Sequence, residues 1–201
     1  MKIKKILAIA AAAALIGGYS TVAFADEEVS AQQGGAQNGF YVGAKGGYSW
    51  IDSYKITDTK RKTGNFAWGV EGGYDYAFNR TFSLGLEVSY FDYGRTKYTG
   101  NTEGKFKSRS INLMLTGKAY VQDNFNVFVK GGLARVKQKY SGKITGNTKN
   151  KTKPIVEVGA GYQFNNNIGV DVSYVHVFGK DKTNPASVNA IFAGVSYKIM
   201  V

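Results

Sequence analysis

Residues 82–90 of the chain read FSLGLEVSY, and bulky apolar residues alternate there with small or polar ones. Every even-numbered residue from Phe82 to Tyr90 is apolar or aromatic, whereas the odd-numbered ones are serine, glycine or glutamate. Because successive side chains of a strand point to opposite faces, this alternation predicts a β-strand with one apolar and one small, polar face.

The same alternation recurs along most of the chain. It is found around residues 41–50, 68–76, 111–115, 127–129, 156–162, 168–174 and 191–199. We therefore expect an all-β protein of eight strands. Most of these strands would be about 10 to 13 residues long, which suits strands that cross a bilayer at a tilt.

The connections between the expected strands alternate in length. Three are tight turns rich in Asn and Asp, residues that tolerate left-handed backbone angles, near residues 78–80, 122–124 and 165–167. Four are longer, at residues 52–65, 93–109, 137–153 and 179–187. This arrangement predicts an eight-stranded antiparallel up-and-down transmembrane β-barrel with short periplasmic turns and long extracellular loops.

A soluble eight-stranded barrel would alternate in the same way, so the character of the two faces decides between them. The second face is dominated by Gly, Ser and Asn with separated single charges, which suits the cramped interior of a narrow barrel. Aromatic residues at the strand ends are candidates for the two interfacial girdles: Phe40, Trp50, Phe78, Phe125, Phe164 and Phe178. Both features favour an apolar face directed toward lipid.

The N-terminus has the features of an export signal. Lysines at positions 2, 4 and 5 precede a short apolar stretch at residues 6–16, and Ala23-Phe24-Ala25 supplies a cleavage pattern. We predict a signal peptide at 1–25, a flexible periplasmic leader at 26–38, and an outer-membrane barrel domain at 39–201. The expected localisation is the bacterial outer membrane, and the chain has no cysteine for disulfide bonds.

Three segments resemble a known family. Residues 40–48 (FYVGAKGGY), 115–120 (LTGKAY) and 194–198 (GVSYK) are similar to the first, fourth and last strands of the OmpA-type transmembrane domain. That domain belongs to the small outer-membrane barrels of the porin family, which include OmpX and Ail. The resemblance implies the barrel fold and the outer membrane. We expect the peptidoglycan-binding domain of full-length OmpA proteins to be absent.

Charged residues on the polar face are expected to form a paired network inside the lumen, because unpaired charges there would be costly. By strand parity the predicted members are Lys45, Glu71, Asp75, Glu87, Lys118, Lys130, Glu157 and Asp171. The resemblance implies that Glu87 and Lys118 match a gate-like ion pair of OmpA, while Asp171 stands where its partner arginine is expected. The alternatives are a structural plug and a narrow, low-conductance channel.

The net charge of +12 is concentrated in the expected loops. The predicted polyanion-binding residues are Lys60, Arg61, Lys62, Lys105, Lys107, Lys137, Lys139, Lys143, Lys149, Lys151 and Lys153. Their partners are predicted to be phosphates of lipopolysaccharide and outer-membrane lipid, or acidic host glycans and host proteins. No specific nucleic-acid binding is expected, because an exported protein does not meet nucleic acid.

Three further predictions concern assembly and catalysis. Gly194, Tyr197 and Ile199 fit the pattern that the barrel-assembly machinery reads in a last strand. The single histidine, His176, shares no face with Ser173, so lipid A modification is disfavoured, and no cofactor or metal is expected. The sequence therefore predicts a non-enzymatic outer-membrane barrel that supports envelope integrity, adhesion or resistance to host defences.

Overall fold

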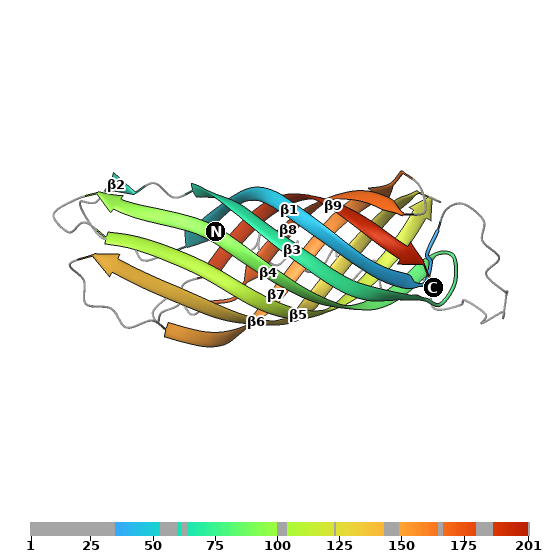
Figure 1. Ribbon diagram of the computed structural model, residues 1–201, viewed down its shortest axis with the longest axis horizontal. Coiled ribbons are helices and arrows are strands. Elements are labelled where there is room, and N and C mark those ends of the chain that lie inside the picture. Colours follow the sequence, from blue (N-terminus) through green and yellow to red (C-terminus); the bar gives the residue numbers. More distant parts are fainter. Residues whose placement is uncertain are drawn as a thin grey trace, which may run out of the picture. The chain divides into compact units, whose positions relative to one another are not determined.

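The computed structural model describes residues 35–52, 60–61, 64–99, 104–122, 124–142, 149–164, 167–179 and 187–200. Their strands are β1 (Gly39–Asp52), β2 (Lys60–Arg61), β3 (Gly64–Ala77), β4 (Phe82–Thr99), β5 (Gly104–Gln122), β6 (Phe125–Gly142), β7 (Lys149–Gln163), β8 (Ile168–Val177) and β9 (Ser187–Met200) (Figure 1). No helix long and apolar enough to cross a membrane is found among these residues.

Eight of these strands close into an antiparallel barrel, as the alternation predicts. From β3 to β9 each strand pairs with the next, β1 pairs with β3, and β1 closes the barrel on β9. The closing seam runs from Gly39 opposite Met200 to Asp52 opposite Ser187. The two-residue β2 lies outside this count and pairs only with the end of β4. The eight barrel strands form an up-and-down meander, in which each pairs with the next along the chain and the seam joins the first to the last.

The two faces of the strands have the predicted orientation. On the outer face Val42 is 60% exposed and Leu86 is 57% exposed, whereas on the inner face Ser49 and Glu87 are fully buried. Exposed apolar side chains continue around the outside on every barrel strand. A belt of this extent on the outside of a closed barrel is the surface that a bilayer covers.

One end of the barrel, here called the turn end, carries the three short connections. Asn79 begins one of them, and its Oδ1 accepts hydrogen bonds from the backbone N–H groups of Thr81 and Phe82, both at 2.8 Å. The last part of the leader lies against this turn. Ala36 N–H donates to the carbonyl of Arg80, and Asn38 Oδ1 accepts from Ala77 N–H. The end of the predicted leader thus contacts the turn between β3 and β4.

At the opposite end, the loop end, the strands are longer than predicted. Much of the expected loops 93–109 and 137–153 is strand, since β4, β5 and β6 have 18, 19 and 18 residues while β8 has 10. Figure 1 shows these three strands reaching beyond β8 and β9. The outward apolar alternation ends at Ile111 on β5 and Leu133 on β6, but backbone pairing continues to Gly104 opposite Gly142 and to Gln138 opposite Lys149. We call residues 92–99, 104–110, 134–142 and 149–154 the strand extension.

The loop-end half of the lumen is filled by apolar side chains. The cluster comprises Ala67, Phe91, Tyr93, Met114, Ala134, Val136, Ile155, Val175, Val177, Val188, Ala190 and Phe192. The rings of Phe91 on β4 and Phe192 on β9 meet at a centroid distance of 5.1 Å, although two strands separate β4 from β9 in the sheet. Gly69 makes room for this contact, because a Cβ there would lie 2.2 Å from the Phe91 ring.

Candidate functional site

The turn-end half of the lumen contains ion pairs that join strands across the barrel. Lys45 on β1 places its Nζ 2.6 Å from Glu157, 3.1 Å from Glu71 and 3.1 Å from Asp171. These carboxylates come from β7, β3 and β8. Gly194 on β9 leaves space for the cluster, since a Cβ there would lie 2.5 Å from a carboxylate oxygen of Asp171. One buried ammonium group thereby connects four strands.

A second lysine on the far wall completes this cluster. Lys130 on β6 places its Nζ 2.5 Å from Glu87, 3.1 Å from Glu71 and 3.7 Å from Glu157. The hydroxyl of Tyr41 donates a further hydrogen bond of 2.7 Å to Glu87. Charge-assisted hydrogen bonds of this kind are needed to offset the cost of burying so many charges.

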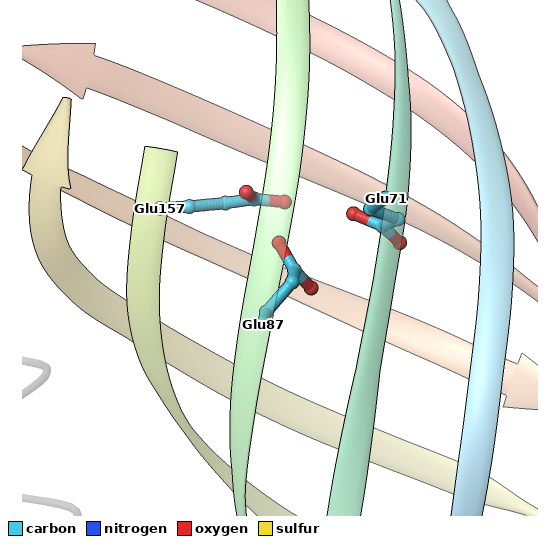
Figure 2. Close-up of side chains that lie close together, drawn as sticks. All are labelled: Glu71, Glu87 and Glu157. Carbon is cyan, nitrogen blue, oxygen red and sulfur yellow. The ribbon is translucent and has the colours of Figure 1, made fainter. Parts of the chain in front are cut away.

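Figure 2 shows that Glu71, Glu87 and Glu157 point toward one another from three strands. Their nearest carboxylate oxygens lie within 4.8 Å of one another, a spacing at which three carboxylates can hold a metal ion. Lys130 Nζ, however, lies within 3.7 Å of an oxygen of each of them. The ammonium group therefore occupies the position of such an ion, and the arrangement is an ion-pair network.

A smaller cluster lies nearer the turn end. Asp75 Oδ2 receives both Lys118 Nζ at 2.7 Å and Lys198 Nζ at 3.0 Å. The ammonium group of Lys118 also lies over the ring of Tyr41, 4.5 Å from its centroid. Beside them is a cavity of about 70 Å³ whose lining includes Asp75, Asp171 and both lysines. That volume and those polar walls suit a few water molecules.

The structure brings all eight predicted lumen residues into these two clusters. Two members of the clusters were not predicted. These are Tyr41, which has the strand parity of Lys45, and Lys198, which has the strand parity of Gly194. The ion pair between Glu87 and Lys118 that the family resemblance implies is not formed. Glu87 pairs with Lys130 and Lys118 pairs with Asp75, so charge partners are exchanged relative to that expectation.

The strand extension carries basic side chains on the outer face of β5 and β6. Lys107 and Arg109 both contact Asp92 on β4, at 3.0 and 3.2 Å. Arg135 and Lys137 on β6 are exposed, and the register places Lys137 directly opposite Arg109. We call Lys107, Arg109, Arg135 and Lys137 the outer basic patch. Arg109 and Arg135 were not among the predicted binding residues.

The inner face of the same extension carries a second basic group on β7. Lys151 and Lys153 pair in register with Val136 and Ala134, which belong to the buried apolar cluster. Their backbone positions therefore lie on the face that continues into the lumen, at the barrel mouth. We call these two lysines the mouth pair. Strand parity thus divides the basic residues between the outer basic patch and the mouth pair. The prediction of loops in these segments could not reveal this division.

The remaining predicted basic residues are only partly described. Lys62 and Lys143 lie outside the described residues. Lys60, Arg61, Lys105, Lys139 and Lys149 lie on strands for which the backbone is described, in β2, β5, β6 and β7. The register places Lys139 opposite Lys107, so the β5–β6 hairpin brings further basic positions beside the outer basic patch.

The residues of the predicted assembly signal and the histidine lie on neighbouring strands. Tyr197 and Ile199 on β9 are 50% and 55% exposed on the outer face, while Gly194 contacts the Lys45 cluster. The glycine of this pattern therefore has a packing role that is independent of assembly. His176 places Nδ1 2.7 Å from Asn189 Oδ1 and packs edge-on against Phe178.

These features define a small outer-membrane β-barrel: a closed antiparallel sheet with an apolar exterior, a filled interior and polar strand extensions at one end. The comparisons with known proteins give the particular family. Residues 35–200 match the OmpA-like transmembrane domain, and the chain belongs to this family of the bacterial outer membrane. The turn end is accordingly periplasmic and the loop end extracellular.

Similar proteins come from several bacteria. An uncharacterized protein of Coxiella burnetii is 30% identical over 80% of this chain and 85% of its own length. Outer membrane protein P5 of Haemophilus influenzae is 29% identical over 84% of this chain, which spans 55% of the length of P5. The crystal structure of Ail from Yersinia pestis has a TM-score of 0.54 at 17% identity, covering 82% of this chain and 99% of Ail.

Proposed function

We propose that this protein is a non-enzymatic structural barrel whose extracellular mouth binds acidic polysaccharide, as a surface adhesin does. The observation that carries the proposal is the mouth pair, Lys151 and Lys153, which extends the basic surface onto the inner face of the strand extension. A polyanion approaching from the medium reaches this face without displacing membrane lipid. Clustered positive charge attracts such a ligand over a distance, and the attraction weakens with salt.

A structural neighbour supports this choice of ligand. Ail has also been crystallised in complex with the heparin analogue sucrose octasulfate, and in that form its TM-score to this chain is 0.50 at 17% identity. The likeness concerns the fold alone, so the sulfated ligand is carried over here as part of the proposal. Sulfated glycans are the class of acidic partner with which the proposal is tested.

The contents of the lumen favour a structural barrel over the alternative of a narrow channel. Phe91, Phe192 and their apolar neighbours fill the extracellular half, and the cavity beside Asp75 lies on the periplasmic side of them. We expect planar bilayers containing the protein to show no steady conductance. A steady conductance that Glu87→Gln alters would favour the channel.

The proposal assigns no catalytic role to His176. Its ring nitrogen contacts Asn189, its ring packs on Phe178, and Ser173 is buried on the opposite face of the strand. A general base must lie within reach of the nucleophile that it activates. Unchanged lipid A mass spectra in a strain that lacks the protein would agree with this assignment, whereas a lost acyl or sugar modification would contradict it.

The direct test is retention of the refolded chain, in phosphatidylcholine vesicles, on immobilised heparin across a sodium chloride titration. We expect Lys151→Gln/Lys153→Gln to raise the dissociation constant about tenfold, the change that corresponds to about 1.4 kcal/mol of lost attraction. Arg135→Gln/Lys137→Gln is the matched control, because it removes the same charge from the outer face of the adjacent strand. Equal retention of wild type and the mouth-pair variant would refute the glycan role.

A further inference from the structure

The outer basic patch faces a different environment from the mouth pair. Its strands carry the lipid-facing belt directly below it, where Ile111, Leu113 and Leu133 are each 57% exposed. Arg135 lies opposite Ile111 in the β5–β6 register, one step beyond Leu133 opposite Leu113. The change from apolar to basic on this face therefore takes place within two residues along each strand.

Aromatic side chains mark the same boundary on the neighbouring strands. Trp68 is 44% exposed on the outer face and its ring packs on Tyr90 at a centroid distance of 5.8 Å. In register, Trp68 pairs with Asp92, and Tyr90 pairs with Ile111. Because tryptophan and tyrosine gather where acyl chains meet headgroups, the patch lies along the interfacial edge of the belt.

The charges of the patch are only partly compensated by protein. Asp92 is 5% exposed and is held by a hydrogen bond from Gly94 N–H at 3.0 Å, in a bulge where Gly94 has φ of +78°. Its Oδ2 forms ion pairs with both Lys107 and Arg109. Within the described part of the chain, no acidic side chain is found at ion-pair distance from Arg135 or Lys137.

Directly opposed like charges on neighbouring strands repel each other. Lys137 lies opposite Arg109 on the outer face, so the hairpin places two cations directly opposite each other there. An external anion that contacts both strands removes this repulsion. Arginine is well suited to phosphate, because its planar guanidinium group can donate two parallel hydrogen bonds.

We infer that the outer basic patch is a binding site for the phosphate groups of the phosphorylated glycolipid, lipid A, in the outer leaflet. The acyl chains of the glycolipid would lie on Ile111, Leu113 and Leu133, and its phosphates would contact Arg109, Arg135 and Lys137. Asp92 is a positioning residue that holds the side chains of Lys107 and Arg109. The inference rests on the proposed function and deepens it by assigning the outer basic patch to the lipid leaflet and the mouth pair to a soluble glycan.

The test compares two double variants of equal charge at neighbouring positions on β6 and β7. Arg135 pairs with Thr152, which lies between the two lysines of the mouth pair, so the variants differ mainly in the face that they alter. Arg135→Gln/Lys137→Gln removes charge from the outer face, and Lys151→Gln/Lys153→Gln removes it from the inner face. Heat-modified migration on gels confirms that each variant is folded before its binding is measured.

The probe is lipid A with both phosphates, titrated into detergent-solubilised full chain, with lipid A stripped of phosphates as the second arm. We expect the outer variant to bind phosphorylated lipid A about thirty-fold more weakly, since each basic residue near an anionic lipid surface contributes roughly a factor of five. The mouth variant is expected to stay within about threefold of wild type. Neither variant should change the binding of the stripped lipid.

Two results would overturn the inference. In one, the outer variant binds phosphorylated lipid A as wild type does. In the other, both variants weaken equally, which would indicate a general effect of net charge. The heparin experiment tests the glycan role independently of the lipid A experiment. An outer variant that loses lipid A, beside a mouth variant that retains wild-type heparin binding, would support the lipid site and reject the proposed function.

Discussion

The two halves of the lumen are filled by different kinds of side chain. In the periplasmic half, long charged side chains meet across the barrel, and Lys45 and Lys130 connect four acidic residues. In the extracellular half, Phe91 and Phe192 meet across the barrel without any charge. Glycine on the wall makes room in both, at Gly194 beside the ion pairs and at Gly69 beside the rings.

The difference lies in how each half responds to the loss of one component. An apolar cluster that loses a side chain loses contacts in proportion to the volume removed. An ion-pair network that loses one member retains a buried charge whose solvation is not replaced. Loss of one side chain is therefore expected to destabilise the charged half more, although a cavity of about 70 Å³ lies within that half, beside Asp75.

Lys130→Met is expected to have the largest effect on stability. The substitution removes the ammonium group that lies between Glu71, Glu87 and Glu157 and leaves those carboxylates close together. We expect the free energy of unfolding to fall by about 3–5 kcal/mol, the range for breaking a buried ion pair. The measurement is urea unfolding in phosphatidylcholine vesicles, followed through the fluorescence of Trp50 and Trp68.

A double variant shows whether uncompensated charge is the cause. Glu87→Met/Lys130→Met removes both partners of the shortest of these ion pairs and adds apolar volume. It should be more stable than Lys130→Met alone, giving a coupling free energy of about 1–3 kcal/mol. The free-energy losses of the single variants Glu87→Met and Lys130→Met could instead add up to the loss of the double variant. Lys130 would then act through packing, and the proposed difference between the two halves would be wrong.

Gly69→Ala tests the apolar half and is expected to have an intermediate effect. Its new Cβ would lie 2.2 Å from the ring of Phe91, so the ring must move away from Phe192. Overpacking of this kind costs about 1–3 kcal/mol. The matched control is Gly131→Ala, because a Cβ at Gly131 meets nothing within 4 Å. Equal stability of the two variants would show that the rings of Phe91 and Phe192 can move apart at little cost in free energy.

Much of this architecture could be predicted from the sequence because the alternation has a period of two and lipid selects only one face. The parity of Leu84 and Leu86 on β4 places Glu87 inside, and the parity of Val127 and Val129 on β6 places Lys130 inside, without knowledge of their partners. Parity does not say which charge meets which. Lys118 pairs with Asp75 over the inner face of β4, the one strand that lies between β5 and β3, where Asp75 is opposite Gly85 and Lys118 is opposite Ser83.

The ends of the strands could not be predicted from apolar alternation, since no lipid constrains them. A different regularity was present in the same segment. Lysine or arginine recurs at every second position from Lys105 to Arg109, and again from Lys149 to Lys153. Such spacing indicates paired strands in water as clearly as leucine does in lipid. Interpreting these segments as loops hid the division into the outer basic patch and the mouth pair.

Asp92→Asn is expected to have the smallest effect on stability. It allows the ion pairs on the rim to be compared with those in the lumen. Its partners Lys107 and Arg109 have side chains that are 24% and 47% exposed, compared with 4% for Lys130. Water screens the rim pairs, so we expect a loss of less than about 1 kcal/mol in the free energy of unfolding.

Salt dependence separates the two classes of ion pair. The loss caused by Asp92→Asn should disappear in about 1 M sodium chloride, where screening acts over roughly 3 Å, while the loss caused by Lys130→Met should persist. The same urea titration at low and high salt measures both. If the effect of Lys130→Met also disappeared, salt would have access to the ion pairs in the lumen, and the distinction between buried pairs and rim pairs would be wrong.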